Sequence, residues 1–282
     1  MQGRMVLITR RLIALLTVLS LATVLAGCGG QSSTYDVSSI GPKVHIGVLA
    51  DQPGLGFTRS GQRSGLDIDV ARYILHELGF VPSQIVWSDL LPAQREEALE
   101  SGRVDMILAG YSITGPRSQR VDFAGPYFIS GQDLLIRKAD RRIRGVGDLG
   151  GRRVCAVAGS TSVEGIIQRV PQAQVRERDR IGACVTALLS GDADAVTGDG
   201  MALAGASAVM GGGQLALLGA TFTSERYGVA VRHGQPELVA AIDKALDHMM
   251  TDGSWMQSVR NAASGIGFEI DPKASRPIPP VH

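Results

Sequence analysis

Two similar stretches of the sequence end in residues that could recognise a small charged molecule. ALESGRVDMILAG begins at Ala98 and ends at Gly110, and ALLSGDADAVTGD begins 89 positions later at Ala187 and ends at Asp199. A carboxylate can pair with a cation, and a glycine, which lacks a Cβ, lets a ligand approach the backbone closely. If the stretches end equivalent strands, Gly110 and Asp199 face each other across a cleft, because ligands bind beyond the carboxyl ends of strands in open α/β sheets. Alternatively, the repeat is a common helix stop, Gly110 is a turn glycine and Asp199 caps the next helix.

The segment AGST, residues 158–161, adds a candidate anion site. Ser160 and Thr161 open a predicted helix, and the exposed amides of a helix N-terminus favour an anion, although plain capping would also explain these residues. The sequence contains neither a Gly-x-x-x-x-Gly-Lys-Ser/Thr loop nor a Gly-x-Ser-x-Gly elbow. Its five histidines are scattered without ligand spacing. We therefore expect no catalytic residues, no metal and no cofactor, and the net charge of +1 without a basic stripe predicts no nucleic-acid partner.

The elements around these residues alternate between short apolar strands and amphipathic helices from Val44 onward. One helix, DIDVARYILHELGF, has apolar residues at helical spacing and Asp67 placed to cap it. Strands that alternate with helices predict an α/β fold with parallel sheets covered on both faces. Two such runs meet near residues 127–132, and a length of 282 residues allows one large or two modest domains.

The N-terminus has the features of a secretory signal. Arg4, Arg10 and Arg11 precede an apolar run that is too short to be a good spanning helix. The run ends in LAGC, residues 25–28, which looks like a bacterial lipobox. We therefore predict a signal peptide over residues 1–27, lipidation of Cys28 and a flexible tether over residues 28–43, with an ordinary cleavage site as the alternative. The mature protein would lie outside the cytoplasmic membrane, anchored to its outer face by lipid.

Removal of the lipidated cysteine leaves Cys155 and Cys184. An even pair in an oxidising compartment favours a disulfide. The entropic model gives such a bond about 3 kcal/mol of stabilisation for a loop of this length. Two buried free thiols remain the alternative.

The order of several motifs resembles the polar amino-acid solute-binding proteins of ABC importers. The motifs are GLDIDVARYILHELG, ALESGRVDMILAGYSITGPR, VDFAGPYFISGQDLLIRK, LGGRRVCAVAGST, ALLSGDADAVTGD and ERYGVAVRHG, within residues 44–267. DQPGLGF, AGPYFISGQDLL and the cysteine pair resemble the glutamate-binding lipoproteins of actinobacteria in particular. The resemblance implies two Rossmann-like α/β lobes joined by two hinge strands, in a monomer that delivers its ligand to a membrane permease. The first lobe would comprise residues 44–126 plus 228–267 and the second residues 132–222, followed by a loose tail, 268–282.

The resemblance also assigns roles at the site. Arg117 matches the arginine that binds the α-carboxylate, for which a guanidinium offers a planar fork of donors. Asp199 matches the acid that pairs with the α-ammonium, although Gly198 stands where relatives usually have a polar residue. Three further positions match carboxylate contacts, and Gly110 matches a glycine whose carbonyl accepts from the ammonium. The three are Ser112, Ser160 and Thr161.

Specificity depends on two further residues. Arg95 matches an arginine that meets the side-chain carboxylate in aspartate and glutamate binders, although it could be an ordinary helix-surface residue. Arg95 and Arg117 contribute +2 and Asp199 contributes −1, so a bound glutamate would leave the closed site neutral. Asp51 matches a position near the ligand side chain in some glutamine binders, and if it points inward the balance favours glutamine or asparagine. The lysine that some relatives carry on the second lobe is replaced here by Val157.

Two other classes of function remain open from sequence. A few relatives on this fold dehydrate small acids, but such chemistry needs an acid or base in the cleft with a tuned pKa. Glu164 is the only glutamate beside the AGST turn, and we expect it to face solvent, so we predict a protein that is not an enzyme. An amino-acid sensor that reports to a membrane kinase would use the same clamp.

Overall fold

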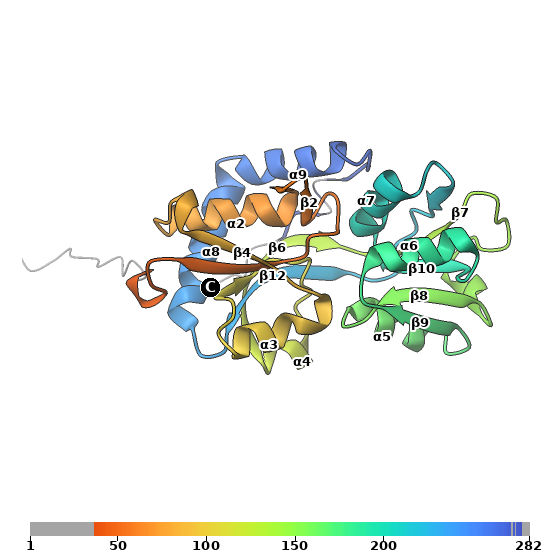
Figure 1. Cartoon of the computed structure of the whole chain (residues 1–282), viewed down its shortest axis with the longest axis horizontal. Coiled ribbons are helices and arrows are strands. Elements are labelled where there is room, and N and C mark those ends of the chain that lie inside the picture. Colours follow the sequence, from red (N-terminus) through yellow and green to blue (C-terminus); the bar gives the residue numbers. More distant parts are fainter. Residues whose placement is uncertain (1–36, 272, 274, 278–282) are drawn as a thin grey trace, which may run out of the picture. The chain divides into compact units, whose positions relative to one another are not determined.

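Two five-stranded sheets form the framework of the part of the chain that the computed structural model describes, residues 37–271, 273 and 275–277 (Figure 1). The predicted signal peptide, Cys28 and residues 28–36 of the predicted tether lie outside these residues. The arrangement confirms the predicted α/β fold of two lobes. No helix within the described ranges has the length and hydropathy needed to cross a bilayer.

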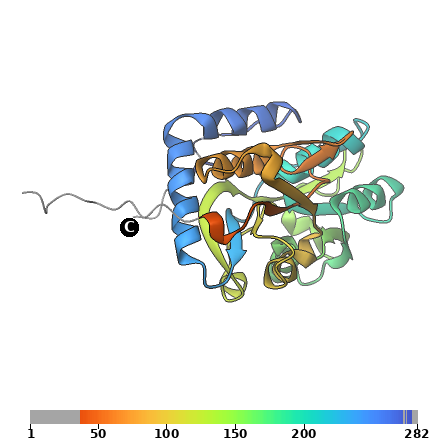
Figure 2. The same cartoon turned by 60° about the vertical axis from the view of Figure 1, so that its left-hand side comes forward.

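The first lobe has helices on both faces of its sheet. Figure 1 shows α2 and α9 on one side of the sheet and α3 and α4 on the other, and Figure 2 shows α8 standing against the end of α9. The strands, in spatial order, are β4 (Ile85–Asp89), β1 (Val44–Val48), β5 (Met106–Ile107), β12 (Glu225–Arg232) and β6 (Val121–Ser130). The helices are α2 (Leu66–Glu77), α3 (Arg95–Glu100), α4 (Gly115–Ser118), α8 (Pro236–Thr251) and α9 (Ser254–Ser264), with 3-10 turns η1 (Val37–Ser39), η2 (Pro82–Gln84) and η3 (Pro92–Gln94).

The second lobe repeats this plan with three helices. Apolar residues of α6 and α7 share one buried cluster with Cys155 and Val196, whereas α5 contributes Ile166 to a cluster on the opposite face. The strands, in spatial order, are β11 (Leu215–Leu217), β7 (Gln132–Arg137), β10 (Ala195–Asp199), β8 (Arg153–Val157) and β9 (Gln174–Arg178). The helices are α5 (Thr161–Arg169), α6 (Ile181–Ser190) and α7 (Gly200–Met210), with the 3-10 turn η4 (Val146–Leu149).

Both sheets are mixed, which corrects the prediction of parallel sheets. β12 runs antiparallel to β5 and β6, and β7 runs antiparallel to β10 and β11. Each of these two strands is the first that the chain forms after it crosses from the other lobe. A strand that enters its sheet from the cleft side runs away from the cleft, whereas its neighbours run towards it, so each crossing produces one antiparallel strand.

The repeated segments form the same helix–turn–strand unit in both lobes. The unit joins α3 to β5 in the first lobe and α6 to β10 in the second. The amide of Val104 donates to the carbonyl of Ala98 at 3.1 Å, and the amide of Ala193 donates to the carbonyl of Ala187 at 2.9 Å. These positions differ by 89, so the hydrogen bonding of the turn repeats with the sequence.

An aspartate in each repeat fastens its strand to the neighbouring strand. Asp105 accepts from the amide of His45 at 2.7 Å and its own amide donates to the carbonyl of His45 at 2.7 Å. Asp194 accepts from the amide of Arg153 at 3.0 Å and donates to the carbonyl of Arg153 at 2.8 Å. The same reciprocal pair therefore positions β5 against β1 and β10 against β8, with their carboxyl ends at the cleft.

Cys155 and Cys184 form a disulfide, which decides between the bond and two free thiols. The bond joins β8 to α6, and both residues are fully buried. It therefore fixes α6 to the sheet one helical turn from Ile181, which lines the cleft described below.

Asp67 does not cap α2, contrary to the prediction. The helix begins at Leu66, after Gly65, whose φ of 111° is one that glycine adopts readily. A Cβ at Gly65 would lie 2.0 Å from the carbonyl oxygen of Leu55, so a glycine is required there. Asp67 is instead fully buried and reaches the cleft wall.

The hairpin of β2 (Phe57–Arg59) and β3 (Gln62–Ser64), and the edge strand β9, were not expected from sequence. Four of the five residues of β9 are exposed, so no apolar alternation marks it. Within the predicted tail, the carbonyl of Ser275 accepts from the amide of Ile129 at 3.0 Å, and the amide of Phe268 donates to Ala263 at 2.9 Å.

Candidate functional site

A cleft between the two lobes collects most of the candidate ligand residues. β5 of the first lobe and β10 of the second both lead into it, so that the ends of the two repeats, Gly110 and Asp199, line one hollow. Seven of the eight candidates line this cleft: Arg95, Gly110, Ser112, Arg117, Ser160, Thr161 and Asp199. Their individual contacts with a ligand stay predictions.

Arg95 is a cleft residue with an exposed fraction of only 2%, not a surface residue of α3. Its Nε donates to the carbonyl of Pro92 at 2.9 Å, its Nη1 to that of Ala109 at 3.2 Å and its Nη2 to that of Gly159 at 2.9 Å. A guanidinium has five N–H groups, so two are left for another acceptor. Burial, and secondly the charge of Arg117, lower the pKa of Arg95 to about 10, and the side chain therefore stays charged at neutral pH.

Arg117 lies in the short helix α4, which Thr114 caps by accepting from the amide of Arg117 at 3.4 Å. Its Nη1 donates to the carbonyl of Ser112 at 2.9 Å and its Nη2 to that of Gly159 at 2.9 Å. Its Nε lies 3.8 Å from a carboxylate oxygen of Glu96. The guanidinium is thus oriented by contacts with both lobes and, like that of Arg95, keeps N–H groups for an anion.

The carbonyl of Gly159 is the point where both arginines meet the second lobe. Arg95 and Arg117 each donate to it at 2.9 Å. Gly159 has a φ of +77°, and a Cβ there would lie 2.7 Å from backbone atoms of Ala93. A side chain would therefore separate the lobes beside the two guanidinium groups.

Tyr111 supports both guanidinium groups and was not expected from sequence. The guanidinium carbons of Arg95 and Arg117 lie 4.1 and 4.7 Å from the centre of its ring. Its hydroxyl donates to Glu96, and burial, followed by this hydrogen bond, raises the pKa of Tyr111 well above its ordinary value. Its place within the AGYSITGPR motif was the available signal.

Asp199 supplies a buried acceptor on the opposite wall. Its Oδ2 accepts from the hydroxyl of Tyr227, whereas its Oδ1 is buried and has no hydrogen-bond partner among the described residues. It stands at the N-cap of α7, but its side chain makes no capping bond. Burial, and secondly the charge of Glu225, raise the pKa of Asp199 to about 7. A cationic group in the cleft would satisfy Oδ1 and favour the ionised form.

Asp67 acts behind the wall of the first lobe. Its Oδ2 accepts from the amide of Gly110 at 3.0 Å and its Oδ1 from the hydroxyl of Tyr127 at 2.7 Å. The same peptide unit presents the carbonyl of Ala109 to Arg95. Asp67 therefore orients the peptide that contacts Arg95 and supplies a nearby negative charge, although burial raises its pKa to about 6.

The start of α5 forms the second-lobe side of the cleft. Ser160 stands at the N-cap, but its side chain makes no capping bond; its hydroxyl instead donates to the carbonyl of Val157 at 2.6 Å. The hydroxyl of Thr161 donates to the carboxylate of Glu225 at 3.0 Å. Capping by Ser160 therefore does not occur, and the first amides of α5 remain available to an anion.

Asp51 is the candidate that does not line the cleft. Its Oδ2 is buried without a hydrogen-bond partner among the described residues. Burial raises the pKa of Asp51, while the charge of Arg180 on the second lobe opposes this effect. The position of Asp51 therefore does not support its placement beside the side chain of an amide ligand.

Three polar residues that were not expected from sequence also line the cleft: Gln52, Ser162 and Thr197. Thr197 stands one residue before Gly198, the position that lacks the usual polar side chain. Its hydroxyl is buried and donates to the carbonyl of Asp133 at 3.1 Å. Val157 also lines the cleft and places an apolar side chain at this position of the second-lobe wall.

The sequence model of the bacterial extracellular solute-binding proteins, family 3, matches residues 44–261. The chain belongs to this family. A glutamate-binding protein, GluB, of Corynebacterium glutamicum is 37% identical over 260 residues, which cover 88% of each chain. An ABC transporter glutamine-binding protein, GlnH, of Bacillus subtilis is 34% identical over 82% of this chain and 89% of its own.

A solved structure of an ancestral arginine-binding protein bound to glutamine is also similar to this chain. It has a TM-score of 0.73 and 32% identity, over 78% of this chain and 97% of the other. Together with the family match, these relatives identify an amino-acid solute-binding protein of an ABC importer. The relatives carry the names of different amino acids, so the ligand must be argued from the cleft.

Proposed function

We propose that this chain is an extracytoplasmic lipoprotein receptor whose two lobes close on glutamate or aspartate. The observation that carries the proposal is Arg95, a buried guanidinium in the cleft whose hydrogen bonds among the described residues all go to carbonyl oxygens. A buried cation without a bound carboxylate favours an anionic ligand group. The similarity to a glutamate-binding protein points the same way.

The proposed pose uses the two walls of the cleft for opposite ends of the amino acid. Arg117, with the start of α5, would hold the α-carboxylate through charge-assisted hydrogen bonds. Asp199 would accept from the α-ammonium through its free Oδ1, with the carbonyl of Gly110 as a second acceptor. Arg95 would then bind the side-chain carboxylate.

Charge balance within the cleft supports an acidic ligand. The two arginines and an ionised Asp199 sum to +1, and glutamate at neutral pH carries −1. The sum counts only charged groups that line the cleft; Glu96, which accepts from Tyr111, and Glu225, which accepts from Thr161, do not line it. A closed cleft strongly disfavours uncompensated charge, so the neutral sum favours closure on glutamate.

An amide ligand is the alternative, and Asp67 is the observation that favours it. Its pKa of about 6 leaves Asp67 largely ionised at neutral pH, one peptide unit from Arg95. If its charge is counted with the cleft, the sum falls to zero and glutamine or asparagine fits. The glutamine-binding relative carries the same implication.

Isothermal titration calorimetry of the mature chain tests the proposal. Glutamate, aspartate, glutamine, asparagine and arginine would each be titrated in turn at pH 7.5. We expect glutamate or aspartate to bind at least about tenfold more tightly than either amide, because the amides leave Arg95 uncompensated. Tighter binding of glutamine or asparagine would replace the acidic assignment with the amide one, and a failure of all five would remove the proposal.

A role in sensing would use the same clamp as a role in transport. We favour transport because the family match and the named relatives are solute-binding proteins. Uptake of labelled ligand by cells with and without the gene separates the two. Uptake that does not depend on the gene would favour the sensor.

A further inference from the structure

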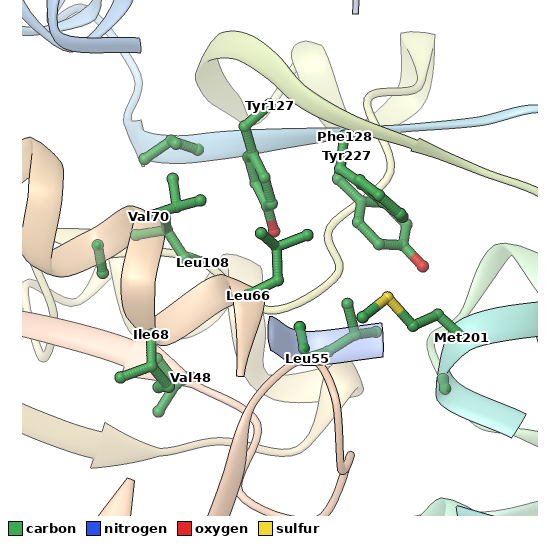
Figure 3. Close-up of a cluster of buried hydrophobic side chains, with 14 of the residues drawn as sticks. Val48, Leu55, Leu66, Ile68, Val70, Leu108, Tyr127, Phe128, Met201 and Tyr227 are labelled. Atoms are coloured by element: carbon green, nitrogen blue, oxygen red, sulfur yellow. The ribbon is translucent and has the colours of Figure 1, made fainter. Parts of the chain in front are cut away.

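A loop of the first lobe packs against α7 of the second. The loop, residues 51–56, carries Pro53 and Leu55, and both are buried. Figure 3 shows Met201 of α7 pointing towards Leu55 and Tyr227, and these three residues belong to one buried cluster. The contact therefore joins the two lobes through residues that do not line the cleft.

Gly205 lies one helical turn after Met201, on the same face of α7, and faces the backbone of Pro53. A Cβ at Gly205 would lie 1.9 Å from the carbonyl oxygen of Pro53 and 2.7 Å from its carbonyl carbon. The three atoms nearest to such a Cβ all belong to Pro53, so the obstruction comes from the other lobe and not from the lobe of Gly205 itself. Because the opposing atoms are backbone, no rotamer change can relieve the overlap.

The geometry points to Gly205 as a positioning residue for ligand binding: its missing side chain lets Pro53 seat on α7, and this seating sets the distance of Asp199 from the arginines. Asp199 is the N-cap residue of α7, so a displacement of the helix moves the carboxylate with it. Gln52, next to Pro53, lines the cleft from the other side of the contact. To reach ordinary contact at 3.4 Å, the two backbones would have to separate by about 1.5 Å. A shift of this size disrupts contacts made by both lobes at once. The inference rests on the proposed function, because it concerns how the closed, ligand-bound form is reached.

Gly205→Ala is the direct test. The residue lies inside α7 and is absent from the positive-φ positions, and alanine is favoured over glycine in a helix interior, so the variant should fold. Gly182→Ala is the matched control: it also adds a methyl group to a helix of the second lobe, but there the nearest atoms are the flexible side-chain end of Met210, at 3.3 Å. Wild type and both variants would be compared by calorimetry with the tightest amino-acid ligand, by thermal unfolding without ligand, and by small-angle scattering with and without saturating ligand.

We expect Gly205→Ala to weaken binding by about tenfold or more. Its ligand-free melting temperature should be no lower than that of wild type, and the ligand-induced decrease in its radius of gyration should be smaller. Gly182→Ala should bind within about twofold of wild type. The inference is wrong if Gly205→Ala binds as tightly as the control, or if it weakens binding while compacting as fully as wild type. A ligand-free melting temperature clearly below that of wild type would overturn it as well, since that would indicate a role within the lobe. A wild-type protein that binds no amino acid would overturn the proposed function and this inference together.

Discussion

The charge of Arg95 provides the sharpest distinction between an acidic and a neutral ligand at the scale of single residues. Arg95→Met keeps a long apolar side chain and removes the guanidinium. A charge-assisted hydrogen bond contributes about 1.5–3 kcal/mol, so glutamate should bind about 10- to 100-fold more weakly. Glutamine should lose much less, and calorimetry with both ligands on the same variant cancels any general effect on folding.

Arg103→Met is the control for this experiment, because Arg103 is exposed and lies beyond the cleft lining. It should leave both affinities within about twofold. An equal loss of glutamate and glutamine binding in Arg95→Met would contradict the assignment of this residue to the side-chain carboxylate.

The raised pKa of Asp199 predicts how stability without ligand depends on pH. Its pKa is about 7 in the folded chain against 3.8 unfolded, so between these values the folded state binds more protons and stability falls as pH rises, until it levels off above about pH 7. Asp199→Asn removes this pH-dependent loss of folding stability, because asparagine does not titrate. Its advantage over wild type in urea unfolding should therefore grow by about 1–3 kcal/mol from pH 5 to pH 8, while amino-acid binding is lost.

A constant difference between the two proteins across this pH range would show that Asp199 titrates normally. Burial also raises the pKa of Asp67, to about 6, so Asp67 contributes a loss of stability with rising pH in the same direction. Asp67 is the same in wild type and in Asp199→Asn, so its contribution cancels in the difference between the two proteins. Asp67→Asn, measured in parallel, separates the two contributions.

Motif order placed Arg95, Arg117 and Asp199 in one site, but it could not supply the contacts that orient them. Local spacing made Asp67 a helix cap, whereas its partners, Gly110 and Tyr127, lie 43 and 60 positions away in sequence. The ring of Tyr111 matters because it touches two arginines that the chain delivers from separate helices. Such long-range contacts leave no periodic signal in the sequence.

At the scale of elements, periodicity identified the strands and helices that have an apolar face. A helical region with a break near Gly253 was predicted from sequence. In the structure, α8 ends just before Gly253 and α9 begins just after it. β9 was missed because an exposed edge strand needs no buried face. Strand direction could not be predicted from sequence either, because the antiparallel orientation of β7 and β12 follows from the crossings between the lobes and not from the residues of these strands.

The disulfide between β8 and α6 is expected to stabilise the second lobe without contributing to the ligand-binding cleft. Its loop spans 29 positions, for which the chain-entropy model gives about 3 kcal/mol. The double variant Cys155→Ala/Cys184→Ala should therefore unfold at lower urea, with a free energy of unfolding reduced by about 2–4 kcal/mol. Glutamate affinity should stay within about threefold, because neither sulfur lines the cleft.

Reducing agent provides the internal control. It should lower the melting temperature of wild type and leave the double variant unchanged. A wild type that is insensitive to reduction, under conditions in which unfolding exposes the sulfur atoms, would indicate that the bond is not formed in the purified protein.

At the scale of the whole molecule, the proposed receptor would have to remain beside its membrane permease. No described helix could span a bilayer, and the candidate anchor, Cys28 in the LAGC motif, lies outside the described residues. A receptor that serves a membrane permease works at a higher local concentration when it is tethered beside it. We therefore expect the full-length chain to be held at the membrane by lipid.

Expression of the full-length chain in a bacterial host tests this anchor. Wild type should partition with the membrane fraction and enter the detergent phase on phase separation, because dual acylation gives stable anchoring whereas a folded polar surface does not. Cys28→Ala should remove lipidation, so that the chain is released in soluble form or keeps its uncleaved signal, and mass spectrometry of the N-terminus distinguishes these results. Wild type and Cys28→Ala, each assayed without trimming, should bind the same amino acid with equal affinity, since the residues that line the cleft lie between positions 49 and 202. Wild type that is secreted in soluble form and cleaved beside an unmodified Cys28 would instead identify an ordinary signal peptide and a freely diffusing receptor.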